Sequence, residues 1–285
     1  MKLPPFELHA PDTVEEATAL LEHFGDEAAV YCGGTELLLL MKLGFAEPRH
    51  LVDVKGIEEL RVLEAVDGTL AVGGAVTHRA IERSPLVRER WPALAAMETR
   101  VANVRVRGAG SLGGNLCFSD PHSDPATFLL AAEGQVVLRR GRDRRRLLAV
   151  RDFVLGPYET ALERGELLAE VRVPELPSGS ALVHTKLAFR ERPAVTVSCL
   201  ARVEDGLVAE ARIAVGSVGL VPRRASAGEE LLLGSPGDAE IEAAGEAAAE
   251  ASDPVADLNG SVEYKRNLVR VLVGRAFRDA VAQAS

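Results

Sequence analysis

The stretch "AGSLGGNLCFSDPHSDP", residues 109–125, constrains the fold more than any other part of the chain. It combines three glycines and two prolines with an asparagine and several serine and aspartate side chains. Glycine weakens helices and strands, and proline removes a backbone donor, so neither element is expected to run through this segment. The sequence therefore predicts a surface loop here, set between longer apolar segments that form the core.

The composition is that of an ordinary globular protein. A length of 285 residues is long for one domain and sufficient for two, and 47% hydrophobic residues supply enough apolar mass for a core. The formal net charge of -9 argues against a nucleic-acid partner, because phosphate backbones require a basic face. The densest basic run, residues 139–146, is interpreted as a solvated hairpin turn.

The sequence gives no sign of a metal centre or a membrane span. Asp120 could be imagined as a metal ligand with His122 or Asp124, but no third ligand follows at a known spacing, and we expect no metal site in this chain. No apolar run approaches the roughly 18 residues of a span. The chain has three cysteines, Cys32, Cys117 and Cys199, and they match no zinc or iron–sulfur spacing. This odd number and the lack of a signal peptide lead us to expect a reducing, cytoplasmic location.

The first fifty-odd residues alternate helix and strand. A helix is predicted over residues 13–25, with Thr13 as its cap, Glu16 completing a capping box and Gly25 ending it. Strands are predicted over residues 28–32 and 50–54. This order suggests a small parallel βαβ unit.

The chain then changes character. Asp67-Gly68 predicts a hairpin, and a helical stretch over residues 84–100 precedes the glycine-rich segment. After that segment, Asp124 is predicted to cap a short helix with Pro125 at its first position. Three further strands are predicted before residue 174, over "QVVLRR", "RRLLAV" and "GELLAEVRVP".

Residues 174–179, rich in Pro, Ser and Gly, are the best candidate for a domain boundary. Three strand-like runs follow, over residues 181–189, 194–203 and 207–218. Two helical segments end the chain, over residues 239–251 and 261–284. This part is therefore predicted to be a three-stranded meander backed by helices.

Two glycine-rich segments are candidates for anion binding. "CGGTE", residues 32–36, runs from a strand into a helix, and glycines there let the backbone approach a ligand while the helix start favours an anion. A tight turn with Thr35 as a cap explains this segment equally simply. Gly113-Gly114-Asn115 offers a second backbone nest, and two such loops in one chain would suit a dinucleotide.

Other known site patterns are absent. Neither loop reads GxGxxG with an acidic residue about twenty positions later, and there is no P-loop, GxSxG or catalytic triad. Lys186 is a lone lysine in an apolar strand; it is either an exposed edge residue or a cation beside an electron-accepting ring. No residue is assigned a catalytic role.

Taken in order, "CGGTELLLLMKLG" and "GSLGGNLCFSDPHSDP" resemble the two flavin-binding signatures of the FAD-binding, or medium, subunit of molybdenum hydroxylases. That family includes the flavoproteins of carbon monoxide dehydrogenase and xanthine dehydrogenase. "FVLGPYETALERGELLAEVRVP" and "HTKLAFRERP" also fit, so the resemblance covers essentially the whole chain.

The resemblance implies an α+β fold in two domains. Residues 1–176 would form a FAD-binding domain of the vanillyl-alcohol-oxidase/murB (PCMH) type, with subdomains over about 1–55 and 56–176. Residues 177–285 would form the C-terminal flavoprotein domain, with its three-stranded antiparallel sheet and helices.

The resemblance also implies which residues bind FAD. The 32–36 turn would hold the pyrophosphate from one side and the 110–115 turn from the other, with Leu167 and Leu168 against the ring system and Lys186 approaching it. Ser123 and Asp124 would face the adenosine end or support its loop. The full predicted set is Tyr31, Cys32, Gly33, Gly34, Thr35, Glu36, Val101, Gly110, Ser111, Gly114, Asn115, Phe118, Ser123, Asp124, Leu167, Leu168 and Lys186.

The function implied is electron transfer. A molybdenum cofactor in a large subunit and two [2Fe-2S] clusters in a small subunit would feed electrons to FAD in this chain, which passes them to NAD, a quinone or oxygen. A dimer of heterotrimers is the assembly implied. Two alternatives remain open: a self-contained flavin oxidoreductase with its own substrate, and a scaffold subunit that has lost the flavin. The sequence marks neither the substrate nor the final acceptor.

Overall fold

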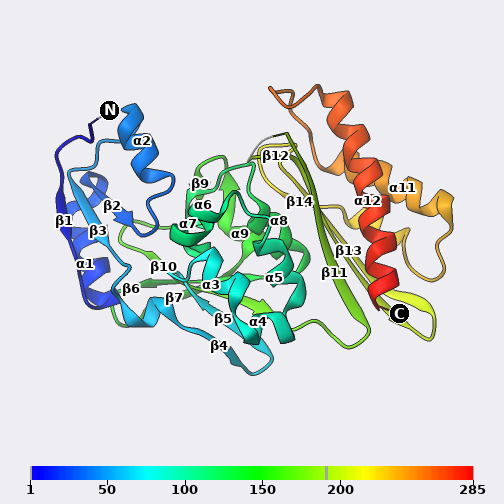
Figure 1. Ribbon diagram of the computed structural model, residues 1–285, viewed down its shortest axis with the longest axis horizontal. Coiled ribbons are helices and arrows are strands. Elements are labelled where there is room, and N and C mark those ends of the chain that lie inside the picture. Colours follow the sequence, from blue (N-terminus) through cyan, green and yellow to red (C-terminus); the bar gives the residue numbers. More distant parts are fainter. Residues whose placement is uncertain (1, 190–191, 285) are drawn as a thin grey trace.

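The structure is a computed structural model that describes residues 2–189 and 192–284. The three larger sheets lie side by side along the molecule (Figure 1), and each is built from one consecutive part of the chain. In the described part of the chain, no helix combines the length and the apolar character needed to cross a bilayer.

The N-terminal part is a parallel three-stranded sheet with the order β1-β3-β2. The predicted βαβ unit is confirmed, because β2 and β3 pair in parallel. Strand β1, which the sequence analysis did not predict, pairs in parallel with β3. The elements are β1 (Glu7–His9), α1 (Val14–Phe24), β2 (Ala28–Tyr31), α2 (Leu37–Leu43) and β3 (His50–Asp53), with short 3-10 turns at Gly25–Glu27 and Glu58–Arg61.

Helix α1 begins and ends as predicted. The Thr13 hydroxyl accepts the backbone N–H of Glu16, and Gly25 follows the last turn with a φ of 55°. The Glu16 carboxylate accepts from the N–H of Asp12 instead of the capping residue's own N–H, so the capping box is shifted by one residue. Helix α2 begins at Leu37 after Glu36, so Thr35 lies in the preceding turn and is not its cap.

The central part is an antiparallel five-stranded sheet with the order β4-β5-β10-β6-β7. Asp67 and Gly68 both have positive φ and close the β4–β5 hairpin as predicted, and the basic run forms the β6–β7 hairpin. The strands are β4 (Leu63–Val66), β5 (Thr69–Gly73), β6 (Gln135–Arg140), β7 (Arg144–Ala149) and β10 (Leu167–Pro174), with a separate pair β8 (Val154–Gly156) and β9 (Glu159–Thr160).

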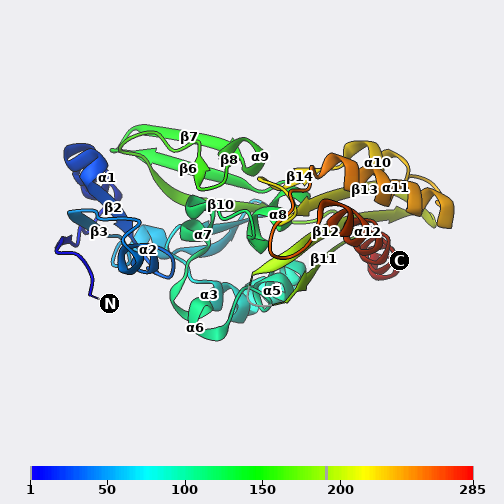
Figure 2. The ribbon, with the colours of Figure 1, turned by 90° about the horizontal axis from the view of Figure 1, so that it is seen from above.

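Seven short helices accompany this sheet. The predicted 84–100 helix is split in two, because Pro92 begins a new helix after Trp91. Figure 2 shows α3, α5 and α6 on one side of β10. The helices are α3 (His78–Arg83), α4 (Pro85–Arg90), α5 (Pro92–Glu98), α6 (Val104–Ala109), α7 (Leu112–Phe118), α8 (Asp124–Ala131) and α9 (Val150–Phe153).

Residues 109–125 are not the surface loop that the sequence predicted, because α7 forms within them. Ser111 caps this helix by accepting the N–H of Gly114 at 3.1 Å. Gly113 is buried, and a β-carbon there would lie 2.5 Å from the Gly74 carbonyl oxygen. Tertiary contact with β5's end therefore outweighs the weak helix propensity of two glycines, about 1 kcal/mol each.

The start of α8 also differs from the prediction. Ser123 occupies the cap position, so Asp124 and Pro125 are the first two helical residues. The Asp124 carboxylate does not cap the helix; it lies buried against the third sheet.

The C-terminal part is a four-stranded antiparallel sheet, not a three-stranded one, because the two-residue strand β14 pairs with β13. Helices α11 and α12 cover one face of this sheet (Figure 1). The elements are β11 (Ser180–Ala188), β12 (Pro193–Glu204), β13 (Leu207–Gly216), β14 (Arg223–Arg224), α10 (Ser226–Glu230), α11 (Asp238–Ala251) and α12 (Val262–Ala284).

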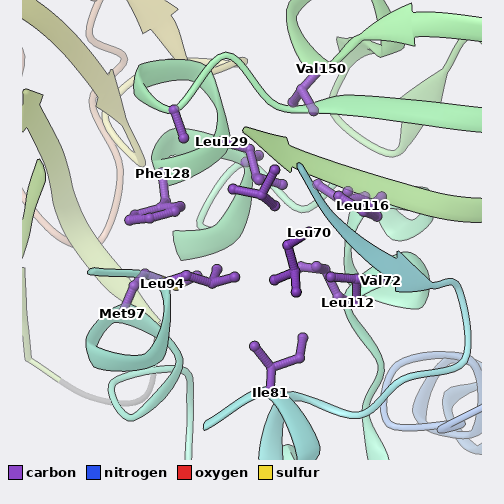
Figure 3. Packing of buried hydrophobic residues seen from close by; sticks show 14 of the residues in the cluster. Leu70, Val72, Ile81, Leu94, Met97, Leu112, Leu116, Phe128, Leu129 and Val150 are labelled. Atoms are coloured by element: carbon purple, nitrogen blue, oxygen red, sulfur yellow. The ribbon is translucent and has the colours of Figure 1, made fainter. Parts of the chain in front are cut away.

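The largest apolar core lies between the central sheet and its helices. Leu70 and Val72 of β5 point into it, and Leu112, Phe128 and Leu129 reach it from α7 and α8 (Figure 3). Because α7 carries both core residues and the exposed Gly114, packing of this core fixes the position of the start of α7.

We predict that Leu129→Ala lowers the free energy of unfolding of the central part by about 3 kcal/mol, because the side chain is fully buried and its removal leaves a cavity. Denaturant titration followed by circular dichroism measures the change. Leu258→Ala is the control, since Leu258 is fully exposed and its truncation should change stability by less than about 0.5 kcal/mol.

Candidate cofactor-binding site

A cleft of about 370 Å³ lies where the N-terminal and central parts meet. Its walls come from the turn after β2, from the turn that begins α7 and from the first residues of β10. Arg192, which precedes β12, reaches the same cleft from the C-terminal part. Three parts of the fold therefore contribute to one site.

The two glycine-rich turns touch through their backbones. A β-carbon on Gly33 would lie 2.2 Å from the Ala109 carbonyl oxygen and 2.6 Å from the α-carbon of Gly110. Gly34 has a φ of +66°, and a β-carbon there would lie 2.6 Å from the Tyr31 ring. Both positions favour glycine, Gly33 because it brings the two backbone turns together and Gly34 because of its positive φ.

The turn after β2 leaves backbone donors near the cleft. The first hydrogen bond of this region runs from the Leu38 N–H to the Gly34 carbonyl, at 3.1 Å. Among the described residues, the N–H groups from Gly34 to Leu37 take no part in the ladder that follows, whereas the Gly33 N–H donates to the Cys32 thiol. Such donors, at a glycine turn that opens a helix, favour an anionic group.

Gly114 differs from the packed glycines. A β-carbon on it would meet one atom within 4 Å, the Ser111 hydroxyl at 3.0 Å, and would otherwise enter open space. Next to it, Asn115 accepts a 2.6 Å hydrogen bond from the Ser123 hydroxyl, which fixes the amide orientation. Gly114 therefore keeps the cleft open instead of serving the packing.

Two carboxylates and one guanidinium meet at the cleft mouth. Arg192 lies 3.4 Å from Glu36 and 3.1 Å from Asp120. Burial raises the pKa of Glu36, against the influence of Arg192. For Asp120, hydrogen bonds from His122 outweigh the effect of burial and lower the pKa. Arg192 thus joins the N-terminal turn to the segment between α7 and α8.

A buried hydrogen bond between a histidine and a glutamate supports the floor of the 110–115 turn. The Nδ1 atom of His78 lies 2.7 Å from the Glu98 carboxylate, and both side chains are almost fully buried. The His78 backbone N–H donates to the Gly110 carbonyl at 3.1 Å. This pair links α3 and α5 to the glycine turn.

The structure brings nearly all the predicted residues to this cleft. Tyr31 and Lys186 are the exceptions: the Tyr31 ring packs behind Gly34 and under the Lys55 ammonium, at 3.9 Å. The sequence analysis missed several lining residues that have no local motif. These include Gly74, His78, Val106, Leu162, Glu166 and Arg192.

Comparison with known proteins places this geometry in a family. Residues 4–176 match the family model described as the FAD binding domain in molybdopterin dehydrogenase, and residues 190–280 match the CO dehydrogenase flavoprotein C-terminal domain. The chain belongs to the FAD-binding medium subunits of molybdenum hydroxylases. The resemblance noted in the sequence and the two-domain α+β fold are thereby confirmed.

Individual relatives share the whole length of the chain. It is 35% identical to the carbon monoxide dehydrogenase medium chain of Hydrogenophaga pseudoflava, over 99% of both chains. It is 33% identical to the nicotine 6-hydroxylase medium subunit of Paenarthrobacter nicotinovorans, over 99% of this chain and all of the other. Quinoline 2-oxidoreductase from Pseudomonas putida 86 superposes with a TM-score of 0.93 at 28% identity, covering all of this chain and 99% of the other.

The residues present in this medium subunit fit FAD. Glycine turns free of side chains suit a pyrophosphate, and the open space in front of Gly114 is where a β-carbon would intrude on a ligand. The buried Leu167 and Leu168 give part of the cleft an apolar wall, as a flat ring system requires.

Asp124 joins the cleft to the C-terminal sheet of the medium subunit. Its carboxylate lies 2.8 Å from the Lys186 ammonium and 3.2 Å from His184 Nε2. Lys186 also donates to the Arg100 carbonyl, at 2.6 Å, and His184 Nδ1 lies 2.8 Å from the Ser198 hydroxyl. We call the group of Asp124, His184, Lys186 and Ser198 the Asp124 clamp. Asp124 lines the cleft, whereas Lys186 does not.

The clamp gives stability a pH dependence. Burial works to raise the pKa of Asp124, but hydrogen bonds and charge from His184 and Lys186 outweigh it and lower the pKa. A carboxyl group whose pKa is lower in the folded state stabilises the fold above its unfolded pKa, about 4. That contribution disappears as the pH falls through the folded-state pKa.

We predict that Asp124→Asn destabilises the protein at pH 7 by about 3 kcal/mol, because it leaves Lys186 without its buried carboxylate partner. The deficit relative to the unsubstituted protein should shrink as the pH is lowered below about 4. Thermal unfolding from pH 3 to 8 measures both effects. Asp152→Asn, at an exposed site, should show neither; a constant Asp124→Asn deficit across this range would contradict the clamp.

Proposed function

We propose that this chain is the FAD-carrying electron-transfer subunit of a molybdenum hydroxylase. The observation that carries the proposal is the backbone contact between two glycine turns at one cleft. Bound FAD would supply the redox chemistry, accepting electrons from [2Fe-2S] clusters of a partner subunit and passing them to NAD, a quinone or oxygen. The chain's own residues bind and orient the cofactor.

We assign the polar roles from the geometry of the cleft. Cys32, Gly33, Gly34, Thr35 and Glu36 would hold the pyrophosphate through backbone donors on one side. On the other side, Gly110, Ser111, Gly114 and Asn115 would do the same from the start of α7. Ser123 would act through Asn115, whose amide it orients.

The apolar lining would take the ring system. Leu167 and Leu168 begin β10 and are buried, and Val101 and Phe118 line the cleft as well. Lys186 would influence the flavin through Asp124, which lines the cleft and holds the lysine ammonium.

The remaining assignments follow from the family. We propose a FAD-binding domain over residues 1–176, divided near residue 55, and a C-terminal domain over 177–285. Relatives are named as medium chains or subunits, which supports large and small partner subunits for this chain. A dimer of heterotrimers and a cytoplasmic location complete the proposal.

We predict that Gly114→Val removes most of the bound FAD, because the new side chain enters the open space that the ligand needs. Asn115→Ala should act in the same direction through loss of the amide held by Ser123. The measurement is FAD per chain from the absorbance of purified protein, with circular dichroism as the test of folding. Gly56→Val is the matched control, because a β-carbon there meets nothing within 4 Å and lies away from the cleft. Stoichiometric FAD in both cleft variants would overturn the site.

We predict that the protein isolated from its own cells is yellow and co-purifies with a molybdenum-containing and an iron–sulfur subunit. Mass spectrometry identifies the partners, and metal analysis of the complex measures molybdenum and iron. A colourless chain would support the flavin-free scaffold instead. A yellow chain that turns over substrate alone, without partners, would support the self-contained oxidoreductase.

A further inference from the structure

A cluster of metal-ligating side chains lies in the N-terminal sheet, away from the cleft. It consists of Glu7 and His9 on β1 and His50 on β3. In the parallel register, Glu7 lies beside His50, and alternation along β1 places His9 on the same face as Glu7. None of the three residues lines the cleft, so the cluster is separate from the proposed FAD site.

The two imidazoles meet through their ring nitrogens. His9 Nε2 lies 3.0 Å from His50 Nδ1, and a Glu7 carboxylate oxygen lies 3.7 Å from the same His50 nitrogen. The ring nitrogens and the carboxylate oxygen therefore converge on one point, where a single ion could contact all three.

The surroundings hold one ring in place. The Phe24 ring at the end of α1 stacks on His50, with centroids 3.7 Å apart and planes 13° apart, and its centroid lies 5.0 Å from that of His9. The side chain of His50 is 16% exposed, whereas that of Glu7 is 67% exposed. The nitrogen ligands are thus preorganised, and the carboxylate side is open to water and to an entering ion.

We propose that Glu7, His9 and His50 form a binding site for one late first-row divalent cation, of which Zn²⁺ is the representative. All three ligand atoms lie within 4.8 Å of one another. Tetrahedral zinc with Zn–N distances of about 2.0–2.1 Å separates its ligands by about 3.3 Å, close to the spacing observed for the imidazoles. Two imidazoles, one carboxylate and a water molecule complete four-coordination.

Binding replaces the contact between the two ring nitrogens with bonds to the metal ion. Both imidazoles bind in their neutral form, each keeping its one proton on the ring nitrogen that does not face the ion, so no redox partner is needed. The ion would join β1 to β3 across the parallel register. Its expected consequence is a higher melting temperature for the loaded protein.

The test is equilibrium dialysis and calorimetry with Zn²⁺ on the FAD-loaded protein, prepared without a histidine tag. We expect one ion per chain with a Kd of about 1 μM or tighter. His9→Ala and His50→Ala should each weaken binding by at least about 100-fold, and Glu7→Gln by about 10-fold. Co²⁺ should give the visible absorption bands of tetrahedral coordination.

His23→Ala is the matched control, because His23 also contacts Phe24, at 4.7 Å, but contributes no atom to the cluster. It should bind Zn²⁺ as the unsubstituted protein does. FAD content and circular dichroism show whether each variant folds; if His50→Ala fails to fold, Glu7→Gln and His9→Ala still decide. Absence of stoichiometric binding at 100-fold the expected Kd, about 100 μM, or equal loss in His23→Ala, would overturn the proposal.

Discussion

The close approach of Gly33 to the Ala109 carbonyl is the contact on which the rest of the site depends. A β-carbon at Gly33 would lie 2.2 Å from that oxygen, so any other residue would push the two turns apart. The contact joins the parallel sheet to the central part where each offers backbone and no side chain. A second glycine contact, Gly113 against Gly74, seats α7 on the central sheet. Together they place two helix starts on the walls of one cleft.

Ion pairs connect the C-terminal part of the chain to the same cleft. Asp124 leaves the capping position of α8 to Ser123 and turns its carboxylate toward Lys186 and His184 of β11. Arg192 makes a second connection at the cleft mouth, to Glu36 and Asp120. A buried carboxylate without such partners would be strongly unfavourable, so docking of the C-terminal sheet and formation of the cleft rim depend on each other.

Local signals in the sequence were sufficient where a local interaction decides the structure. Thr13 and Gly25 bound α1, and Asp67-Gly68 forms the hairpin, because each acts on residues within one turn. Strand β1 was missed because the partner it has in the described part of the chain is β3, about forty residues later, and three residues carry no periodicity. Residues 109–125 were wrongly predicted to be a loop, because helix propensity takes no account of the packing of Gly113 on Gly74.

The same division holds for the cleft. Glycine turns can be recognised from sequence, because the glycines themselves indicate where a positive φ or a close backbone approach is possible. The family resemblance then assigned these turns to FAD. His78, Glu166 and Arg192 reach the cleft from separate elements, with no spacing that links them. Lys186 was predicted to be either an exposed edge residue or a cation beside an electron-accepting ring. It lies on the edge strand β11, and its contact with Asp124 depends on the packing of the C-terminal sheet against α8, which no local signal shows.

The two cysteines that line the cleft, Cys32 and Cys117, are poorly suited to act as nucleophiles or metal ligands. Burial is the main cause that raises the pKa of the Cys32 thiol, and it raises the pKa of Cys117 to about 12. At neutral pH both thiols therefore stay protonated, and a protonated thiol is a poor nucleophile and a poor metal ligand. The cleft thus combines glycine backbone, buried leucines and protonated thiols in its lining. Such a lining suits a bound redox group that does not react with the protein's own thiols.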